Sequence, residues 1–313
     1  MEHYLPYSRY LKGIFNEKTY KIVVTSGLSC PTRDGSIASG GCAFCDVRAS
    51  SSFFGSGFGQ KNPARTIEEQ IKSGMPAMRE RFGARKFLAY FQSYTNTYAD
   101  AAFLRELYQA ALNQPGIEGL CIATRPDCLP DPVLDLLEEL ATDTYLSLEL
   151  GVQSFEDETL KWLGRGHDGE CARKALERLR LRAPHVHICV HLILGAPTDP
   201  PDATVNAARL INSSGARGAK LHQLMVLEGT ELARRWREKP FPTLSIERYA
   251  DAVIEFIETL SPEIYIERLC ATATHAEECL APDWSRMRWT PHNRLREILA
   301  ARSCRQGAKR LRN

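Results

Sequence analysis

The 313-residue chain has 43% hydrophobic and 25% charged residues, which is typical of a globular protein with one large domain or two ordinary ones. Its formal net charge of +2 provides no argument for a nucleic-acid or membrane partner, and no apolar run reaches the ~18–20 residues that a transmembrane helix needs. The amino terminus lacks the basic and then apolar pattern of a secretory signal. We therefore expect a cytoplasmic protein whose ten cysteines are reduced thiols or metal ligands rather than disulfides.

Strands and helices are predicted to alternate after an aromatic and basic N-terminal arm at 1–18. A β-branched run at 20–26 predicts the first strand, and a capping box at Thr66 predicts a helix from there to about residue 82. Between them, the glycine-rich segment 50–59 is a candidate flap. The remaining strands are expected at 86–91, 119–123, 144–150, 187–194 and 218–225, and the remaining helices at 99–113, 131–141, 168–182, 202–213 and 245–260.

This alternation is typical of βαβ units, which build a parallel sheet. Six such units favour an α/β fold in which residues 19–260 form a partial (β/α)6 TIM-like barrel. One more strand is expected at 264–269, and residues 261–313 are predicted to form a short, basic C-terminal α/β extension.

Three of the ten cysteines, Cys30, Cys42 and Cys45, follow the predicted first strand. Thiolates this close together can converge on one metal centre. Structural zinc needs four protein ligands, and only one Cys-x-x-Cys pair is present, although Cys121 and Cys128 are further candidates. A redox Cys-x-x-Cys pair leaves Cys30 without a role. An iron–sulfur cluster with one open iron uses all three cysteines, and the spacing favours it.

Polar side chains lie in or directly after the predicted strands that follow the first one. The carboxyl ends of parallel barrel strands meet on one face, where barrel enzymes carry their chemistry. The polar residues in this layer are Gln92, Ser93, Tyr94, Thr95, Asn96, Thr124, Arg125, Asp127, Glu149, Gln153, Ser154, His191, Lys220, His222 and Gln223. We expect them to share one site with the cysteine loop, and the alternative is that they only face solvent.

The C-terminal stretch 286–313 has nine Lys and Arg against one acid, Glu297, and therefore a net charge of +8. Two interpretations are open. The stretch is either a solvated terminal helix or a surface that contacts RNA phosphates through Lys and Arg.

Several short motifs, which follow one another along the chain, resemble those of the radical S-adenosylmethionine (SAM) superfamily, in particular its Elp3-like members and the bacterial YhcC-type radical SAM proteins. These motifs are Cys-Pro-Thr-Arg-Asp-Gly, Gly-Gly-Cys-Ala-Phe-Cys, Tyr-Phe-Gln-Ser-Tyr-Thr-Asn-Thr-Tyr at 90–98, Ala-Thr-Arg-Pro-Asp-Cys-Leu at 123–129, Glu-Leu-Gly-Val-Gln-Ser at 149–154 and Arg-Gly-His-Asp at 165–168. The eleven residues between Cys30 and Cys42 depart from the usual Cys-x3-Cys-x2-Cys spacing. A second departure is Cys270-Ala271-Thr272, where the family has Gly-Asp.

The resemblance implies a barrel of the radical SAM type with a [4Fe-4S] cluster on Cys30, Cys42 and Cys45, and SAM on the fourth iron. A one-electron reductant such as flavodoxin or ferredoxin would drive SAM cleavage, and the 5′-deoxyadenosyl radical would abstract hydrogen from a substrate. The SAM contacts implied by position are Phe44, Gln92, Ser93, Arg125, Glu149 and Gln153. For Arg125, a salt bridge within the barrel is an equal alternative.

Asp127, His191 and His222 are catalytic candidates on the substrate side, by strand-end position only, and a structural role is as compatible with each histidine. The Elp3-like resemblance and the basic end favour RNA, in particular tRNA, as the substrate. A small metabolite or a protein is the alternative substrate. A non-catalytic metal- or RNA-binding barrel is the alternative from another class.

Overall fold

A seven-stranded parallel sheet forms the centre of the computed structural model, which describes residues 2–46 and 66–310. The candidate flap at 50–59 lies outside the described residues. The strands pair in the order β1-β2-β3-β4-β5-β6-β8. Their bounds are β1 Thr19–Val24, β2 Lys86–Phe91, β3 Ile117–Thr124, β4 Tyr145–Gln153, β5 His187–Leu194, β6 Gly218–Gln223 and β8 Tyr265–Arg268.

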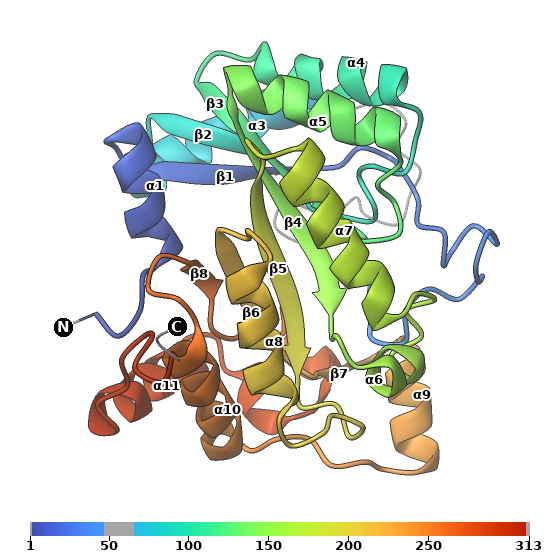
Figure 1. Cartoon of the computed structure of the whole chain (residues 1–313), viewed down its shortest axis with the longest axis vertical. Coiled ribbons are helices and arrows are strands. Elements are labelled where there is room, and N and C mark those ends of the chain that lie inside the picture. The colour runs from blue at the N-terminus through green and yellow to red at the C-terminus, as the bar shows by residue number, and fades with distance from the viewer. Residues whose placement is uncertain (1, 47–65, 311–313) are drawn as a thin grey trace.

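Helices cover the outer face of this curled sheet (Figure 1). They are α3 Ile67–Phe82, α4 Ala101–Leu112, α5 Asp131–Asp143, α7 Gly169–Arg182, α8 Ala203–Ser213 and α10 Ile246–Thr259, and the shorter α6 Asp157–Trp162 and α9 Glu231–Glu238 lie in connections. The predicted capping box begins α3, since Thr66 and Glu69 exchange side-chain to backbone hydrogen bonds. The α/β partial barrel expected from the sequence is confirmed, with β8 as a seventh strand.

Alternation along the strands separates the helix-packed face from the barrel interior. In β2, Phe87, Ala89 and Phe91 pack in the large core under the helices, while Leu88 and Tyr90 belong to a second cluster inside the barrel. Successive side chains of a strand point to opposite faces of the sheet, and here both faces are buried. The interior residues therefore decide what the barrel can hold.

The amino-terminal end of the barrel is covered by α1, Tyr7–Phe15, which belongs to the predicted N-terminal arm. Tyr7 and Leu11 pack with Tyr145 and Tyr265, the first residues of β4 and β8. Cys121 is buried in the same cluster, and burial raises the pKa of its thiol to about 12. Cys121 therefore belongs to the apolar interior.

The sheet crosses the expected domain boundary at 260, because β8 pairs in parallel with β6. Beyond β8 lie the 3-10 turns η1 Ala276–Glu278 and η2 Asp283–Arg286, the strand β9 Cys279–Ala281 and the helix α11 Thr290–Ala301. β9 pairs antiparallel with the two-residue β7 Val226–Leu227, which follows β6. Gln223, the last residue of β6, donates through Nε2 to Ser285 Oγ at 2.8 Å. This bond holds η2 at the carboxyl end of β6.

Candidate functional site

The three cysteines of the candidate metal loop lie on the segment that leaves the carboxyl end of β1. The backbone of Ala43 ties this loop to distant elements, since its amide donates to the carbonyl of Leu163 after α6 (2.8 Å) and its carbonyl accepts from the amide of Leu232 in α9 (2.9 Å). Cys30 Sγ is 3.0 Å from Thr95 Oγ1, which follows β2. The loop is therefore fixed against three other strand-end connections.

Arg33 explains part of the long gap between Cys30 and Cys42. Its Nη2 donates to the carbonyl of Cys45 at 3.1 Å, so the gap folds back over the end of the loop. Gly41 has φ +81°, and a Cβ there would lie 2.9 Å from the Arg33 guanidinium. Glycine is therefore required both by the backbone conformation and by this close approach.

Two buried guanidinium groups surround the Cys42 sulfur. Arg165 Nη1 donates to Cys42 Sγ at 3.1 Å, and Arg125 Nη1 lies at 3.6 Å. Burial raises the pKa of the Cys42 thiol, but Arg165 and Arg125 outweigh burial and bring it below its usual value. Burial leaves the pKa values of Cys30 and Cys45 above the usual value. Because thiolate is the form that binds metal, Cys42 is prepared for ligation.

The donor set of the cysteine loop fits an iron–sulfur cluster. Cys30, Cys42 and Cys45 are free thiols on one loop, and a [4Fe-4S] cluster binds each of its thiolate ligands at a different iron. Within residues 2–46 and 66–310, no three His, Cys, Asp or Glu side chains are grouped so that they could hold one metal ion.

Four of the predicted SAM contacts lie around the carboxyl-end face. Phe44 is in the cysteine loop, Gln92 and Ser93 follow β2, and Gln153 ends β4 with a left-handed φ of 70°. Ser93 is 2% exposed, and its Oγ has no hydrogen-bond partner among the described residues. A buried hydroxyl without a partner is uncommon in folded proteins, and it fits a site that a polar cofactor completes.

Arg125 forms the salt bridge that was the alternative to SAM binding. Its Nε and Nη2 donate to the two carboxylate oxygens of Asp127 at 2.8 and 2.7 Å, and Nη2 also donates to the carbonyl of Arg165. Together with the contact to Cys42, these bonds use at least four of its five N–H groups. Burial raises the pKa of Asp127, but Arg125 brings it below its usual value, so Asp127 is ionised at neutral pH. A SAM contact by Arg125 and a substrate contact by Asp127 stay predictions.

Glu149 lies inside the barrel in a layer of charged residues, formed with Lys21, Lys220 and Glu267 and hereafter called the charged layer. The Glu149 side chain is 0% exposed and pairs with Lys21 and with Lys220 Nζ at 2.7 Å, and it accepts from Tyr90 Oη at 2.7 Å. Glu267 pairs with the same two lysines at 2.9 and 2.7 Å. The layer thus balances two positive charges with two negative ones. A SAM contact by Glu149 stays a prediction, and its carboxylate already has several partners.

The two catalytic candidate histidines face the same interior. His191 Nε2 lies 2.8 Å from Glu149 Oε2, and His222 Nδ1 lies 2.6 Å from the carbonyl of Gln223. Burial, with a smaller effect of Lys220, lowers the pKa of His191. Burial lowers the pKa of His222 to about 3. Both imidazoles are therefore neutral at pH 7 and can exchange hydrogen bonds without carrying charge.

A cavity of about 950 Å³ opens next to Asp127. It is lined by the loops after β2 and β3 and by the exposed face of α7, including Cys128 and Cys171. Asp127 separates this cavity from Arg125 and the cysteine loop. The cavity is a second place, beside the barrel mouth, where a small ligand could approach the site.

Sequence reasoning did not single out Arg165, Lys21 or Glu267. Arg165 was noted only as part of the motif Arg-Gly-His-Asp, and Lys21 was visible as a lone charge in a β-branched strand. A charged residue inside a run of strand residues signals a buried partner. The partners of Lys21, however, come from β4 and from β8 at the other edge of the sheet, and the local sequence pattern does not identify them.

The comparison with protein families decides the class. The model of the Radical SAM superfamily matches residues 35–211, and the model of the Radical SAM C-terminal domain matches residues 216–301. The chain belongs to the radical SAM superfamily. It is therefore an enzyme that binds a [4Fe-4S] cluster and SAM. The superfamily match includes Cys42 and Cys45 and begins after Cys30.

Similar proteins support the narrower resemblance. Protein YhcC of Escherichia coli (strain K12) is 36% identical over 277 residues, which cover 88% of this chain and 85% of YhcC. YtqA of Bacillus subtilis (strain 168) is 33% identical over 298 residues, 95% of this chain and 90% of YtqA. A tRNA uridine(34) acetyltransferase of Methanocaldococcus infernus is 30% identical over 208 residues, which are 64% of this chain but only 34% of that enzyme.

Solved structures bear out the fold. Methanocaldococcus infernus Elp3 with an N-terminal deletion superposes with a TM-score of 0.66 at 16% identity, over 92% of this chain and 64% of that chain. Methylornithine synthase (PylB) gives a TM-score of 0.52 at 15% identity, over 83% of this chain and 67% of that chain. This chain thus spans just under two thirds of the Elp3 structure. Among its described residues, no helix has the length and apolar character required to cross a bilayer.

Proposed function

We propose that Cys30, Cys42 and Cys45 hold the [4Fe-4S] cluster and that this enzyme uses SAM to abstract hydrogen from an RNA, with tRNA as the first candidate. The observation that carries the site is the Cys42 sulfur between the Arg165 and Arg125 guanidinium groups, on a loop that also contains the other two cysteines. When bound, the cluster supplies the electron that cleaves SAM into methionine and the radical-bearing fragment.

The surrounding residues have separate tasks. Arg165 and Arg125 lower the pKa of the Cys42 thiol, and Arg33 fixes the backbone of Cys45. The buried Ser93 hydroxyl has a free hydrogen-bonding capacity, and in the proposal it binds the methionine end of SAM together with Gln92. Phe44 packs along the adenine, and Gln153 lies near the ribose. Glu149 and Arg125 are further SAM contacts in the proposal, through the hydrogen-bonding capacity that their present partners do not use.

The substrate enters from the carboxyl-end face. The opposite end is closed by α1 and its tyrosine cluster, and the charged layer fills the barrel above that cluster. His191 and His222 are neutral and line the same interior, so they are the candidates for hydrogen bonds to the substrate. Asp127 is the candidate on the side of the outer cavity. In the proposal, flavodoxin or ferredoxin delivers the electron, and all partners are cytoplasmic.

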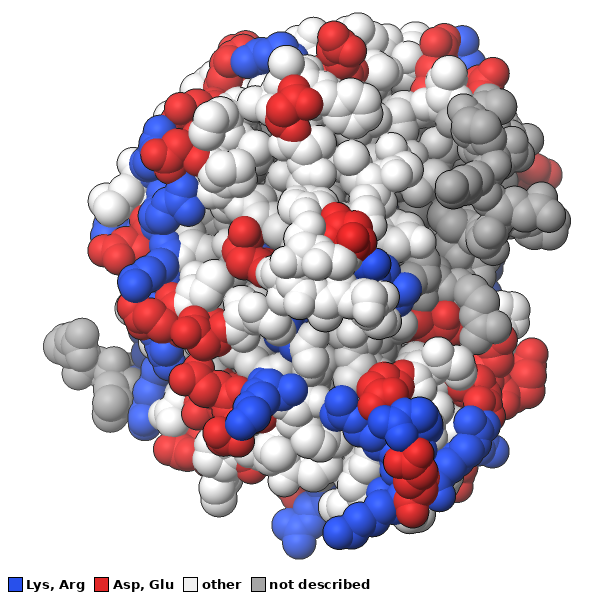
Figure 2. Space-filling view, turned by 90° about the vertical axis from the view of Figure 1, so that its right-hand side faces the viewer, with Lys and Arg blue, Asp and Glu red and all other residues white. Residues whose placement is uncertain are grey.

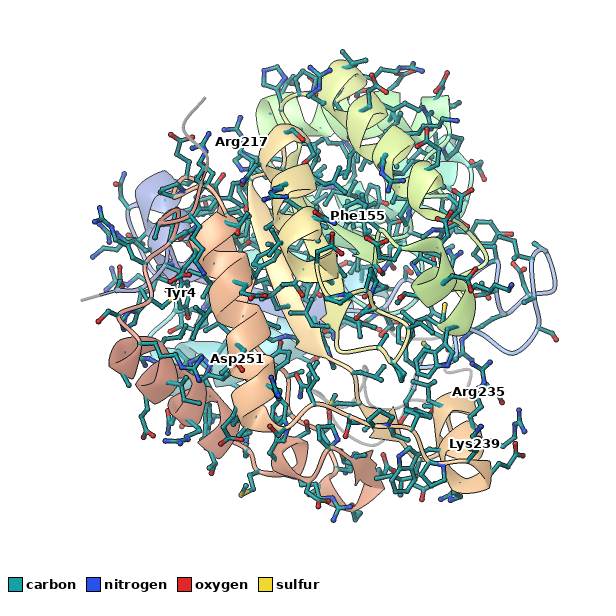
Figure 3. All side chains as sticks on the ribbon, turned by 60° about the horizontal axis from the view of Figure 1, so that its bottom comes forward. Tyr4, Phe155, Arg217, Arg235, Lys239 and Asp251 are labelled. Carbon is teal, nitrogen blue, oxygen red and sulfur yellow. The ribbon has the colours of Figure 1, made fainter. Side chains whose placement is uncertain are left out.

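The RNA part has two supports. One is the similarity to tRNA uridine(34) acetyltransferases. The other is the acid-poor stretch 286–296, which contains four arginines. The rest of the basic end is partly neutralised, because Arg302 pairs with Asp251 on the outer side of α10 (Figure 3) and Lys309 pairs with Glu258 at 2.7 Å.

The arginines of α9 form no comparable surface. Each is ion-paired with a glutamate of the same helix or of the turn before it. Figure 2 shows Lys and Arg in blue intermixed with Asp and Glu in red at its lower right. Figure 3 places Arg235 on α9 and Lys239 directly after this helix, apart from α10. In the stretch 286–296, Arg286 and Arg294 are also paired, with Asp283 and Glu297, but Arg288 and Arg296 have no ion pair among the described residues. This stretch is therefore the better candidate for phosphate contacts.

The test is the modified-nucleoside profile of total tRNA and rRNA from a gene-deletion strain beside its parent. We expect at least one modified nucleoside to disappear and to return with the wild-type gene but not with Cys42→Ala. Identical profiles, together with 5′-deoxyadenosine formation by the purified enzyme, would contradict the RNA substrate. They would favour the alternative, radical chemistry on a small metabolite or a protein.

A further inference from the structure

Trp289 has the most exposed large hydrophobic side chain among the described residues, at 65%. Met287, two residues earlier, is 48% exposed, and the guanidinium of Arg288 lies 5.8 Å from the centre of the Trp289 ring. All three stand in the stretch 286–296, which has four arginines and no acid. Arg286 pairs with Asp283 at 3.4 Å and Arg294 with Glu297 at 3.3 Å, whereas Arg288 and Arg296 have no ion pair among the described residues. Exposed apolar surface and positive charge thus coincide in one short segment.

This segment is firmly anchored on both sides. Before it, Ser285 accepts from Gln223 at the end of β6, and Trp284 donates through Nε1 to the carbonyl of Leu244 at 2.9 Å. After it, Pro291 is buried at the start of α11. Trp284 also packs against Tyr249, with ring centres 5.4 Å apart. Because both flanks are fixed, Trp289 is held at the surface rather than folded inward.

The segment lies on the functional side of the barrel. Gln223 ends β6, and the cysteine loop leaves the carboxyl end of β1, so both belong to the carboxyl-end face. Figure 1 shows the C-terminal segment, in red, below the carboxyl ends of β5 and β6. A ligand bound at Trp289 would therefore lie at the rim of the opening through which a substrate enters.

We propose that Met287, Arg288 and Trp289 form a stacking platform for an unpaired base of an RNA at the rim of the barrel. The inference rests on the proposed RNA substrate and makes it more specific. Indole rings stack on any base, and arginines beside them bind the adjoining phosphates. The guanidinium of Arg294, which is exposed and 3.3 Å from Glu297, is placed one helical turn further for a second phosphate. A single-stranded loop or end fits this surface, whereas a duplex hides its bases.

The test uses the reconstituted holoenzyme, a tRNA transcript and a short single-stranded RNA, with fluorescence anisotropy at low salt. Trp289→Ala should weaken binding of both RNAs by about 5- to 100-fold, since one base–aromatic stack contributes that much. Trp289→Phe should retain most of the affinity. Arg288→Gln should reduce the slope of log affinity against log salt by about one. Leu181→Ala is the matched control, because Leu181 is 62% exposed between two arginines on α7 and should not change binding.

A second readout is the emission of Trp289 itself. RNA should quench the intrinsic fluorescence of the wild type, and the quenched part should be missing in Trp289→Phe. This comparison remains informative if Trp289→Ala does not fold. Iron content and melting temperature should match the wild type in every variant that is compared.

Three results would overturn the platform. Unchanged RNA affinity of Trp289→Ala refutes it while the RNA substrate stands. Failure of the wild type to bind either RNA at low salt refutes the platform and the RNA substrate together. Quenching of Trp289 by an acidic flavodoxin, but not by RNA, would identify the same surface as the docking site of the reductant.

Discussion

Replacing Arg165 by Gln removes a positive charge and an N–H donor from the candidate cluster ligand Cys42. Arg165 Nη1 is 3.1 Å from Cys42 Sγ, and its Nη2 donates to the carbonyl of Gly151, so the guanidinium is fixed on both sides. Reduction adds one negative charge to a [4Fe-4S] cluster. Hydrogen bonds and positive charge at a ligand sulfur stabilise the reduced state and raise the reduction potential. Arg165→Gln should therefore lower the potential.

The size of the shift follows from Coulomb's law. The added electron is spread over the cluster beyond the sulfur, at about 6 Å from the guanidinium. At an effective dielectric constant of about 20, two unit charges at that distance interact by about 3 kcal/mol. For a one-electron couple, 59 mV corresponds to a tenfold change in the equilibrium constant, so the shift is about 130 mV. Arg165→Lys keeps the charge and should shift the potential by less than half of this.

The assay is a potentiometric titration of the reconstituted cluster without SAM, followed by electron paramagnetic resonance. Arg105→Gln serves as the control, because Arg105 is an exposed arginine paired with Glu139 and should leave the potential unchanged. An unshifted potential in Arg165→Gln with full iron content would refute the reasoning. If that variant binds no iron, Arg165→Lys still provides the test.

Two further predictions concern the barrel interior and the SAM site. Glu149→Gln leaves Lys21 and Lys220 with one carboxylate, Glu267, in place of two, and should cost about 3–5 kcal/mol of stability, measured by denaturant unfolding. Burial raises the pKa of Glu149, but Lys21 and Lys220 hold it well below 4.5. The stability difference between the wild type and Glu149→Gln should therefore be largest at neutral pH and shrink as the pH falls below 4.5. A pH-independent stability difference would contradict the ion pairs. Ser93→Ala should weaken SAM binding by about 3- to 10-fold in calorimetry with an unchanged melting temperature, and unaltered affinity would remove Ser93 from the site.

The fold was largely predictable because its information is local. Helical and strand patterns alternate along the chain, and the structure contains each expected strand from 20–26 to 218–225. The pairing of Arg125 with Asp127 was also within reach, since the two residues are two positions apart at one strand end. Such features need no knowledge of how distant elements meet.

Long-range contacts were not predictable in the same way. Arg165 reaches Cys42 across 123 positions because the connection after α6 packs beside the cysteine loop. The charged layer unites Lys21 from one edge of the sheet with Glu267 from the other, and only the curling of the sheet brings these strands together. The sequence shows each partner as an isolated charge. Their complementarity exists only in three dimensions.

The central claim is that three cysteines of one loop hold the cluster, and Cys30 tests it most directly. Cys30 is separated from Cys42 by eleven residues and lies outside the superfamily match. Anaerobic reconstitution should give about four irons per chain in the wild type and in Cys128→Ala, because [4Fe-4S] contains four irons. Cys30→Ala should lose the cluster and form no 5′-deoxyadenosine from SAM. A Cys30→Ala variant that keeps four irons and full 5′-deoxyadenosine formation would contradict the account.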